Sequence, residues 1–183
     1  RLQTRDGFVC VALCWIVLSV FGALPYFLSG SCGFVDAIFE TVSGLTTTGA
    51  SIFSSPSSLP RGLQLWRALT QWMGGMGILV LMLALLPKLS EGSVNLMKAE
   101  SPGPISTKLR PRTGETARIL YRIYITLTVA EALLLRIAGM PLFDALTTAL
   151  TTISTGGFSI RDASVAYYDS SLINWIIIFF MFA

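Results

Sequence analysis

The sequence predicts an all-α protein that crosses a membrane several times. Of its 183 residues, 53% are hydrophobic and 13% are charged, and the mean hydropathy is +0.69. A soluble domain has about 25% charged residues, so this chain has too few charges to cover a surface in water. Uncharged stretches long enough to span a bilayer recur along the chain, and one pattern of segments occurs twice.

The first half contains two predicted spans with a shorter segment between them. Residues 7–28 and 68–87 have no charged side chain, and each stretch reaches the length of about 20 residues that a spanning helix needs. Residues 34–45 are apolar but too short to cross, and the sequence Thr-Thr-Thr-Gly-Ala-Ser follows them. A short helix followed by Thr, Ser and Gly is typical of a re-entrant segment, which enters the membrane and turns back.

A basic segment separates this half from the next. Residues 87–122 contain seven Lys or Arg residues against three Glu residues. Short loops rich in Lys and Arg stay on the cytoplasmic side of a membrane. We therefore expect a cytoplasmic linker at residues 88–116, between one unit at 1–87 and another at 117–183. The linker either contacts anionic lipid or a cytosolic partner, or serves only to fix the orientation.

The second half repeats the order of the first. A span is predicted at residues 117–138, although four charged side chains lie in it, and a short apolar segment at 140–153 precedes Ser-Thr-Gly-Gly-Phe-Ser. The apolar residues 171–183 form about 20 Å of helix, whereas the hydrocarbon core of a bilayer is about 30 Å thick. We expect this last helix to be truncated.

An internal repeat supports the division into two units. Asp36 and Asp144 lie 108 residues apart, within the sequences Phe-Val-Asp-Ala-Ile and Leu-Phe-Asp-Ala-Leu, and the same shift pairs Gly49 with Gly157. The repeat therefore predicts the same order of elements in each half, namely a helix, a pore helix, a Thr-x-Gly filter loop and a second helix.

The two loops have the composition of a cation filter. No charged residue lies in 46–51 or 154–159, so a cation there would be held by backbone carbonyl oxygens, which can replace its hydration shell. The C-terminal end of each short helix also favours a cation through its dipole. Two loops form only two sides of a pore, whereas a potassium-channel filter uses four. We therefore expect further units or dimerisation, and favour further units.

The sequence resembles the TrkH-type subunits of the Trk/Ktr/HKT potassium-transporter superfamily over essentially its whole length. The similar segments include DAIFETVSGLTTTGAS at 36–51, LWRALTQWMGGMGILVLMLALLP at 65–87, AGMPLFDA at 138–145 and TTISTGGFS at 151–159. The resemblance implies four successive helix–pore-helix–filter–helix units around one pore, of which this chain contains two.

The resemblance also implies a function and a location. The protein would take up potassium across the bacterial cytoplasmic (inner) membrane as a multi-pass protein, with K⁺ as the transported ion and no organic cofactor. Its expected partners are a cytosolic nucleotide-binding regulatory ring, a second copy in a homodimer and membrane lipid, but not nucleic acid.

The same resemblance assigns the site residues. Ion binding is implied for the filter carbonyls at Thr47, Thr48, Gly49, Thr155, Gly156 and Gly157, with potassium at Thr47, Thr48, Thr155 and Gly156. A supporting role is expected for Thr46, Ser154, Asp36 and Asp144, of which the two aspartates lie near helix starts, where the dipole favours a carboxylate. In plant relatives a Ser in place of the first filter glycine accompanies sodium transport, so Gly49 indicates potassium.

Other functions stay open from the residues alone. The chain could belong to a sodium-coupled or poorly selective monovalent-cation transporter, or to a non-conducting membrane scaffold or regulatory subunit. An enzyme is not expected, because the sequence has no histidine and no predicted span contains a lysine. Glu40, on the first pore helix, either attracts cations or makes structural hydrogen bonds. The Gly-Gly-Met-Gly sequence at 74–77 predicts close helix packing or a kink.

Overall fold

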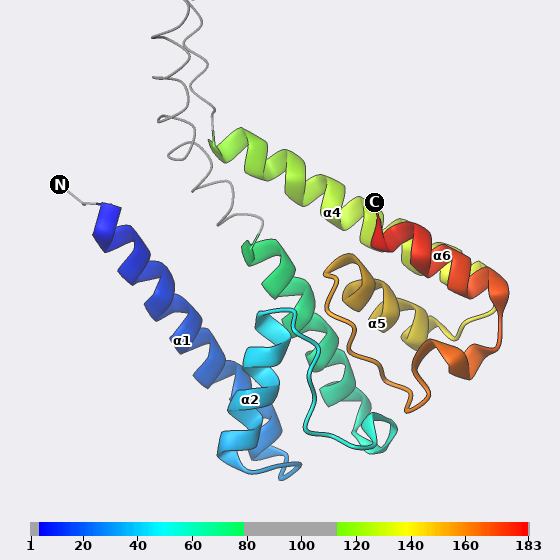
Figure 1. The fold of residues 1–183 in the computed structure, drawn as a ribbon, viewed down its shortest axis with the longest axis horizontal. Helices are drawn as coiled ribbons and strands as arrows, with labels where there is room; N and C mark the ends of the chain where they lie inside the picture. Colours follow the sequence, from blue (N-terminus) through cyan, green and yellow to red (C-terminus); the bar gives the residue numbers. More distant parts are fainter. Residues whose placement is uncertain (1–3, 79–112, 183) are drawn as a thin grey trace, which may run out of the picture.

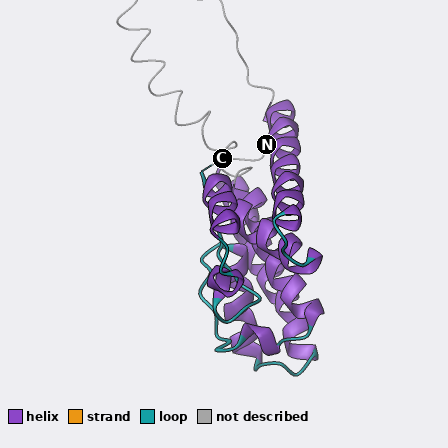
Figure 2. Ribbon diagram, turned by 90° about the vertical axis from the view of Figure 1, so that its right-hand side faces the viewer, coloured by secondary structure: helices purple, strands orange, loops and turns teal. Residues whose placement is uncertain are grey.

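The computed structural model describes residues 4–78 and 113–182, and every regular element in them is helical, as predicted (Figure 1 and Figure 2). In chain order the elements are α1 (Thr4–Leu28), α2 (Phe34–Leu45), the 3₁₀ turn η1 (Pro56–Ser58), a helix described over residues 61–78, α4 (Thr113–Ile137), α5 (Leu142–Ile153), the 3₁₀ turn η2 (Ser164–Tyr168) and α6 (Ser171–Met181). Apart from its last residues, which belong to α4, the expected linker at 88–116 lies outside the described residues, as do residues 79–87 of the second predicted span.

Helix α1 has the length and composition of a membrane span. Its stretch Val9–Leu28 has a mean hydropathy of 2.2, and only 11% of the 18 residues that form its most apolar part are buried within the protein. The large apolar side chains of Leu13, Ile16 and Phe21 are more than half exposed. Such a surface is costly in water but stable against lipid chains. Within the described residues, α1 is the one helix that is both long and apolar enough to cross a membrane.

Helix α4 has a different character. It is 25 residues long and begins at Thr113, before the predicted start at residue 117. Four charged side chains lie along the predicted span, and one of them, Glu131, is completely buried. Arg136 donates to the carbonyl oxygen of Met140 over 3.3 Å, in the turn that leads to α5. The length of α4 therefore agrees with a span, while its composition is more polar than that of α1.

The two short helices form as predicted. Each has 12 residues and an acidic residue in its first turn. Helix α2 coincides with the predicted 34–45, whereas α5 begins at Leu142, because Pro141 has an extended backbone and precedes the helix as its N-cap. Figure 1 shows that α1 and α4, the helices before them, start on the same side of the molecule and run in the same direction. The two halves thus have the same arrangement.

Each half has its own hydrophobic core. In the first half, Ala37 of α2 packs within a cluster of buried residues formed by Ala23, Tyr26, Ala37, Leu59 and Leu63. In the second half, Ala145 of α5 lies in a cluster formed by Leu135, Met140, Ala145, Ile173 and Ile177. The two alanines are 108 residues apart, and both are completely buried. The internal repeat is therefore also a repeat of packing.

The helix at residues 61–78 lies between α2 and α5 (Figure 1) and joins the two halves. A methyl group added to Gly74 would overlap the backbone of Leu45, the last residue of α2. One added to Gly75 would lie 3.1 Å from Cβ of Ser154, the C-cap of α5. The close packing predicted from the glycines at 74–77 is confirmed, because two adjacent glycines contact the ends of the two pore helices.

We expect Gly74→Ala to destabilise the intact protein by about 1–3 kcal/mol, because the added methyl group would push the helix away from α2. The matched control is Gly62→Ala in the same helix, where nothing lies within 4 Å of the added carbon. Thermal unfolding of the two purified variants in detergent checks this. Equal melting temperatures for both variants would contradict the close approach at Gly74.

Candidate functional site

The two predicted filter loops leave their pore helices by the same hydrogen-bonded turn. In each half, the backbone amide of the second residue after the C-cap donates to the carbonyl of the residue five positions earlier. The amide of the first residue after the C-cap donates to the carbonyl three positions earlier. These bonds, each 2.8–2.9 Å long, are Thr48 N to Ser43 O, Thr47 N to Gly44 O, Gly156 N to Thr151 O and Thr155 N to Thr152 O. This is the Schellman arrangement, which normally requires a residue in the left-handed conformation.

That left-handed residue is a threonine in both loops. Thr47 and Thr155 each have φ of 54°, and the glycines two residues later have φ of 78° at Gly49 and 77° at Gly157. Glycine adopts such angles freely, whereas a β-branched residue there is an outlier that costs about 1–3 kcal/mol. The surrounding structure maintains the same strain at equivalent positions of both halves, which is typical of a functional loop.

The carbonyl oxygens of these loops lack hydrogen-bond donors. Among the hydrogen bonds made by the described residues, none ends on the carbonyl of any of the six predicted ion-binding residues, Thr47, Thr48, Gly49, Thr155, Gly156 and Gly157. Gly156 is buried, Thr47 and Gly49 are half-buried, and Thr48, Thr155 and Gly157 are exposed. Carbonyl oxygens that lack a protein donor are available to water or to a cation. The same part of the chain contains no cluster of acidic, Cys or His side chains that could hold a metal ion.

The structure brings the two loops together. A side chain added to Gly49 would overlap the carbonyl oxygen of Gly156, so the first loop touches the second. Thr47 and Thr155 both line one cavity of about 360 Å³, which also reaches Tyr124 of α4. The predicted ion-binding residues of the two halves are therefore neighbours, although 108 residues separate them in the chain.

The predicted supporting residues differ in what they do. The hydroxyl of Thr46 donates to the carbonyl of Val42 over 2.8 Å, and that of Ser154 donates to the carbonyl of Leu150 over 2.9 Å, so both reinforce the end of a pore helix. Asp36 is exposed at the start of α2, where no side-chain cap is formed.

Asp144, at the start of α5, is buried in an ion pair. Its carboxylate accepts hydrogen bonds from Arg161 over 2.7 Å and from the hydroxyl of Tyr168 over 2.6 Å. These contacts tie the segment after the second loop to the start of its pore helix. The hydrogen bond to Asp144 is the main cause of a raised pKa at Arg161, and burial is the main cause of a raised pKa at Tyr168.

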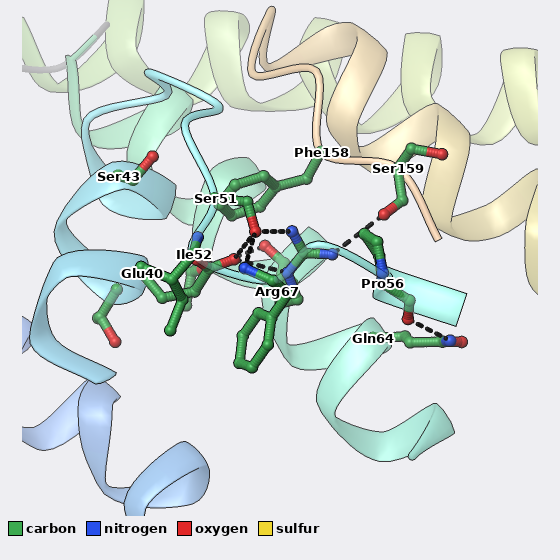
Figure 3. A network of polar contacts seen from close by, with 12 residues as sticks. Glu40, Ser43, Ser51, Ile52, Pro56, Gln64, Arg67, Phe158 and Ser159 are labelled. Carbon is green, nitrogen blue, oxygen red and sulfur yellow. Dashed lines mark hydrogen bonds and ion pairs between the residues drawn. The ribbon is translucent and has the colours of Figure 1, made fainter. Parts of the chain in front are cut away.

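Glu40 makes structural contacts, which decides between the two roles left open for it. The carboxylate is completely buried and accepts hydrogen bonds from Arg67 over 2.8 Å, from the Ser51 hydroxyl over 3.0 Å and from the Ile52 amide over 3.0 Å (Figure 3). Its charge is balanced by Arg67, which is 2% exposed. Glu40 thus holds the end of the first loop against the pore helix.

Gln71 contacts the second loop from the helix at residues 61–78. Its side-chain oxygen accepts a hydrogen bond from the amide of Phe158 over 3.1 Å, and its amide group fills the space beside Gly156. The sequence indicated neither Gln71 nor Arg67 as a site residue. Only their position in the sequence could have indicated a role. Arg67 directly precedes the predicted span at 68–87 and Gln71 lies inside it, and polar side chains at such positions are often functional.

Asp162 connects the outer loops of the two halves. Its exposed carboxylate accepts hydrogen bonds from the hydroxyl of Ser57 over 2.7 Å, from the amide of Ser57 over 3.1 Å and from the hydroxyl of Ser55 over 3.0 Å. The bonds from Ser57 are the main reason that the pKa of Asp162 is lowered from its ordinary value. This contact was not predicted, because the partners lie more than 100 residues apart in the chain.

A family of cation transport proteins, TrkH, matches residues 1–183 of this chain. The Trk system potassium uptake protein TrkH of Salmonella typhimurium is 51% identical over 99% of the chain, and TrkG of Escherichia coli is 41% identical over 96% of it. The crystal structure of the potassium transporter TrkH from Vibrio parahaemolyticus superimposes with a TM-score of 0.83 at 41% identity over 98% of the chain. The chain spans 38% of the length of the Salmonella protein, 37% of TrkG and 36% of the crystallised chain.

We expect Asp162→Ala to lower the melting temperature of the intact protein at neutral pH. Because the folded-state pKa is lowered, the stabilisation by Asp162 is complete above the unfolded pKa of about 3.9 and disappears as the pH falls through the folded value. Melting curves of wild type and variant between pH 7 and pH 3 should therefore converge below about pH 3.9. A difference that stays constant, or grows toward acid pH, would contradict this role.

Proposed function

Because the chain belongs to the TrkH family of cation transport proteins, we propose that it is part of a potassium uptake protein and that its two Thr-x-Gly loops form part of the ion filter. Members of this family are integral proteins of the bacterial cytoplasmic (inner) membrane, and the chain is located there. The names of its relatives, which are potassium uptake proteins, support potassium as the cargo.

The observation that supports the filter most directly is the pair of matched loops. Both leave a pore helix through a strained threonine, both place a glycine at positive φ two residues later, and their carbonyls have no donor in the described structure. Residues at positive φ turn their peptide planes, so that neighbouring carbonyls can face one axis. Such oxygens can replace the water around a cation.

Transport on this proposal needs no covalent chemistry. Potassium would exchange its hydration shell for carbonyl oxygens at Thr47, Thr48, Thr155 and Gly156, with Gly49 and Gly157 completing the loops. The dipole of each pore helix, which has its negative end at the loop, would favour the cation further. The remaining oxygens would come from two more units of the intact protein, consistent with the 38% of a relative's length that this chain spans.

The organisation and partners of the intact protein belong to the same proposal. Residues 1–87 and 117–183 would each be one helix–pore-helix–filter–helix unit, with 88–116 as a cytoplasmic linker. A cytosolic nucleotide-binding ring and a second copy of the protein would be its partners. The relatives are named as parts of a Trk system, which supports an assembly of more than one component.

Gly157→Asp in the intact protein should abolish growth of uptake-deficient cells on low potassium, because a side chain at φ of 77° would distort the second loop. Gly30→Asp is the matched control. Gly30 also has positive φ, 70°, and open space around it, but it lies in the loop between α1 and α2. Growth of the Gly157 variant at the wild-type rate, with both variants equally abundant in the membrane, would argue against the filter.

Tracer uptake into liposomes that contain the purified intact protein separates potassium transport from the two alternatives. We expect rubidium, as a potassium substitute, to enter without sodium, and excess sodium to compete poorly. Uptake that requires sodium, or that sodium blocks efficiently, would favour the sodium-coupled or poorly selective transporter. Absence of any uptake would favour the non-conducting scaffold.

A further inference from the structure

The guanidinium group of Arg67 lies between the two loops and bonds to both of them (Figure 3). One nitrogen donates to the hydroxyl of Ser51, the last residue of the first loop, over 3.0 Å. Another donates to the carbonyl oxygen of Ser159, the last residue of the second loop, over 3.0 Å. The third nitrogen donates to the carboxylate of Glu40, on the first pore helix, over 2.8 Å. A single side chain thus joins three segments that meet at the candidate filter.

The two loop residues that Arg67 contacts are equivalent in the internal repeat. Ser51 and Ser159 are 108 residues apart, and each lies two residues after its filter glycine. The guanidinium therefore joins equivalent positions of the two units. The distance between those points sets how far apart the two rows of carbonyl oxygens lie.

The surroundings of Arg67 hold the guanidinium in one position. The side chain is 2% exposed, its charge is paired with that of a fully buried Glu40, and its carbon Cζ lies 4.3 Å from the centre of the Phe158 ring. Arginine keeps its charge in proteins, and its planar fork of donors gives fixed directions. A buried guanidinium that donates a hydrogen bond from each of its three nitrogens is consequently a rigid spacer.

The second half offers no equivalent spacer of its own. The residue that corresponds to Glu40 is Thr148, and the residue that corresponds to Arg67 is Trp175, an exposed residue of α6. The ion pair of the second half, between Asp144 and Arg161, connects two parts of the same unit. Within the described residues, Arg67 bonds to both filter loops, whereas Asp162, which also connects the two halves, bonds to Ser55 and Ser57 beyond the first filter loop.

We propose that Arg67 is a positioning residue that fixes the spacing of the two filter loops and thereby sets the discrimination of potassium against sodium. The proposal rests on the potassium filter proposed above. Carbonyl oxygens select potassium when they are held at the distance and in the number that suit the larger ion. Without the spacer, the loops can move inward and coordinate the smaller sodium ion.

The test measures rubidium and sodium fluxes in liposomes containing the intact protein. We expect Arg67→Met to lower the ratio of rubidium flux to sodium flux by about tenfold, since a hydrogen bond to a charged group is worth about that factor in an equilibrium. Arg67→Lys should not restore the ratio, because an ammonium group lacks the planar fork that reaches both loops. Arg61→Met, at an exposed arginine of the same helix, should leave the ratio unchanged.

Further variants keep the test decisive if Arg67→Met does not accumulate because it leaves Glu40 buried and unpaired. The double variant Glu40→Gln/Arg67→Met removes both charges and should show the same loss of selectivity. Ser51→Ala removes one of the bridging bonds alone and should shift the ratio in the same direction. If any Arg67 variant accumulates in the membrane and has the wild-type flux ratio, the role of Arg67 is overturned. If no Arg67 variant accumulates, a wild-type flux ratio in Ser51→Ala overturns it.

The outcomes also separate this inference from the proposed function. If the wild-type protein transports neither ion, or shows no preference for rubidium, the potassium filter itself is refuted. If the wild type prefers rubidium and the Arg67 variants retain that preference at wild-type abundance, the filter stands and the positioning role is refuted.

Discussion

The close approach of the helix at residues 61–78 to the ends of both pore helices is the constraint on which the rest of the structure depends. Gly74 allows that helix to touch the backbone at Leu45, and Gly75 allows it to touch Ser154. A methyl group at Gly74 would overlap the Leu45 backbone, and one at Gly75 would crowd Ser154, so either would push the helix away from the end of a pore helix. Because the two glycines are adjacent, the ends of the two pore helices lie side by side, and the loops that follow them meet.

The repeat conserves the backbone but not the side chains that support it. Thr47 and Thr155 have the same strained conformation, and the turns around them have the same hydrogen bonds. The buried charges are arranged differently, with Glu40 on one pore helix and Asp144 on the other. A filter needs equivalent carbonyl positions on each side, whereas the surrounding ion pairs only have to hold them. Unequal supports can therefore maintain an almost symmetric backbone in the two loops.

Local patterns were sufficient to predict where the described helices and the two loops lie, although the helix at residues 61–78 begins before the predicted span at 68–87 and the two 3₁₀ turns were not predicted. Helix α2 coincides with its predicted bounds, and the family resemblance is confirmed by the comparisons. The supporting network could not be predicted in this way. Glu40 and Arg67 are 27 residues apart, and no periodicity or motif relates them. Their pairing follows from the packing of two helices and a loop, which hydropathy and spacing do not describe. The roles of the filter residues in ion binding stay predictions.

The separate hydrophobic cores have a consequence for how the protein is made. All members of the first core lie between Ala23 and Leu63, so this half can pack as soon as these residues have left the ribosome and entered the bilayer. The second core requires residues as late as Ile177. During synthesis, Arg67 and Gln71 are therefore inserted before the loop that they contact. The second loop is thus synthesised after the helix that supplies its contacts.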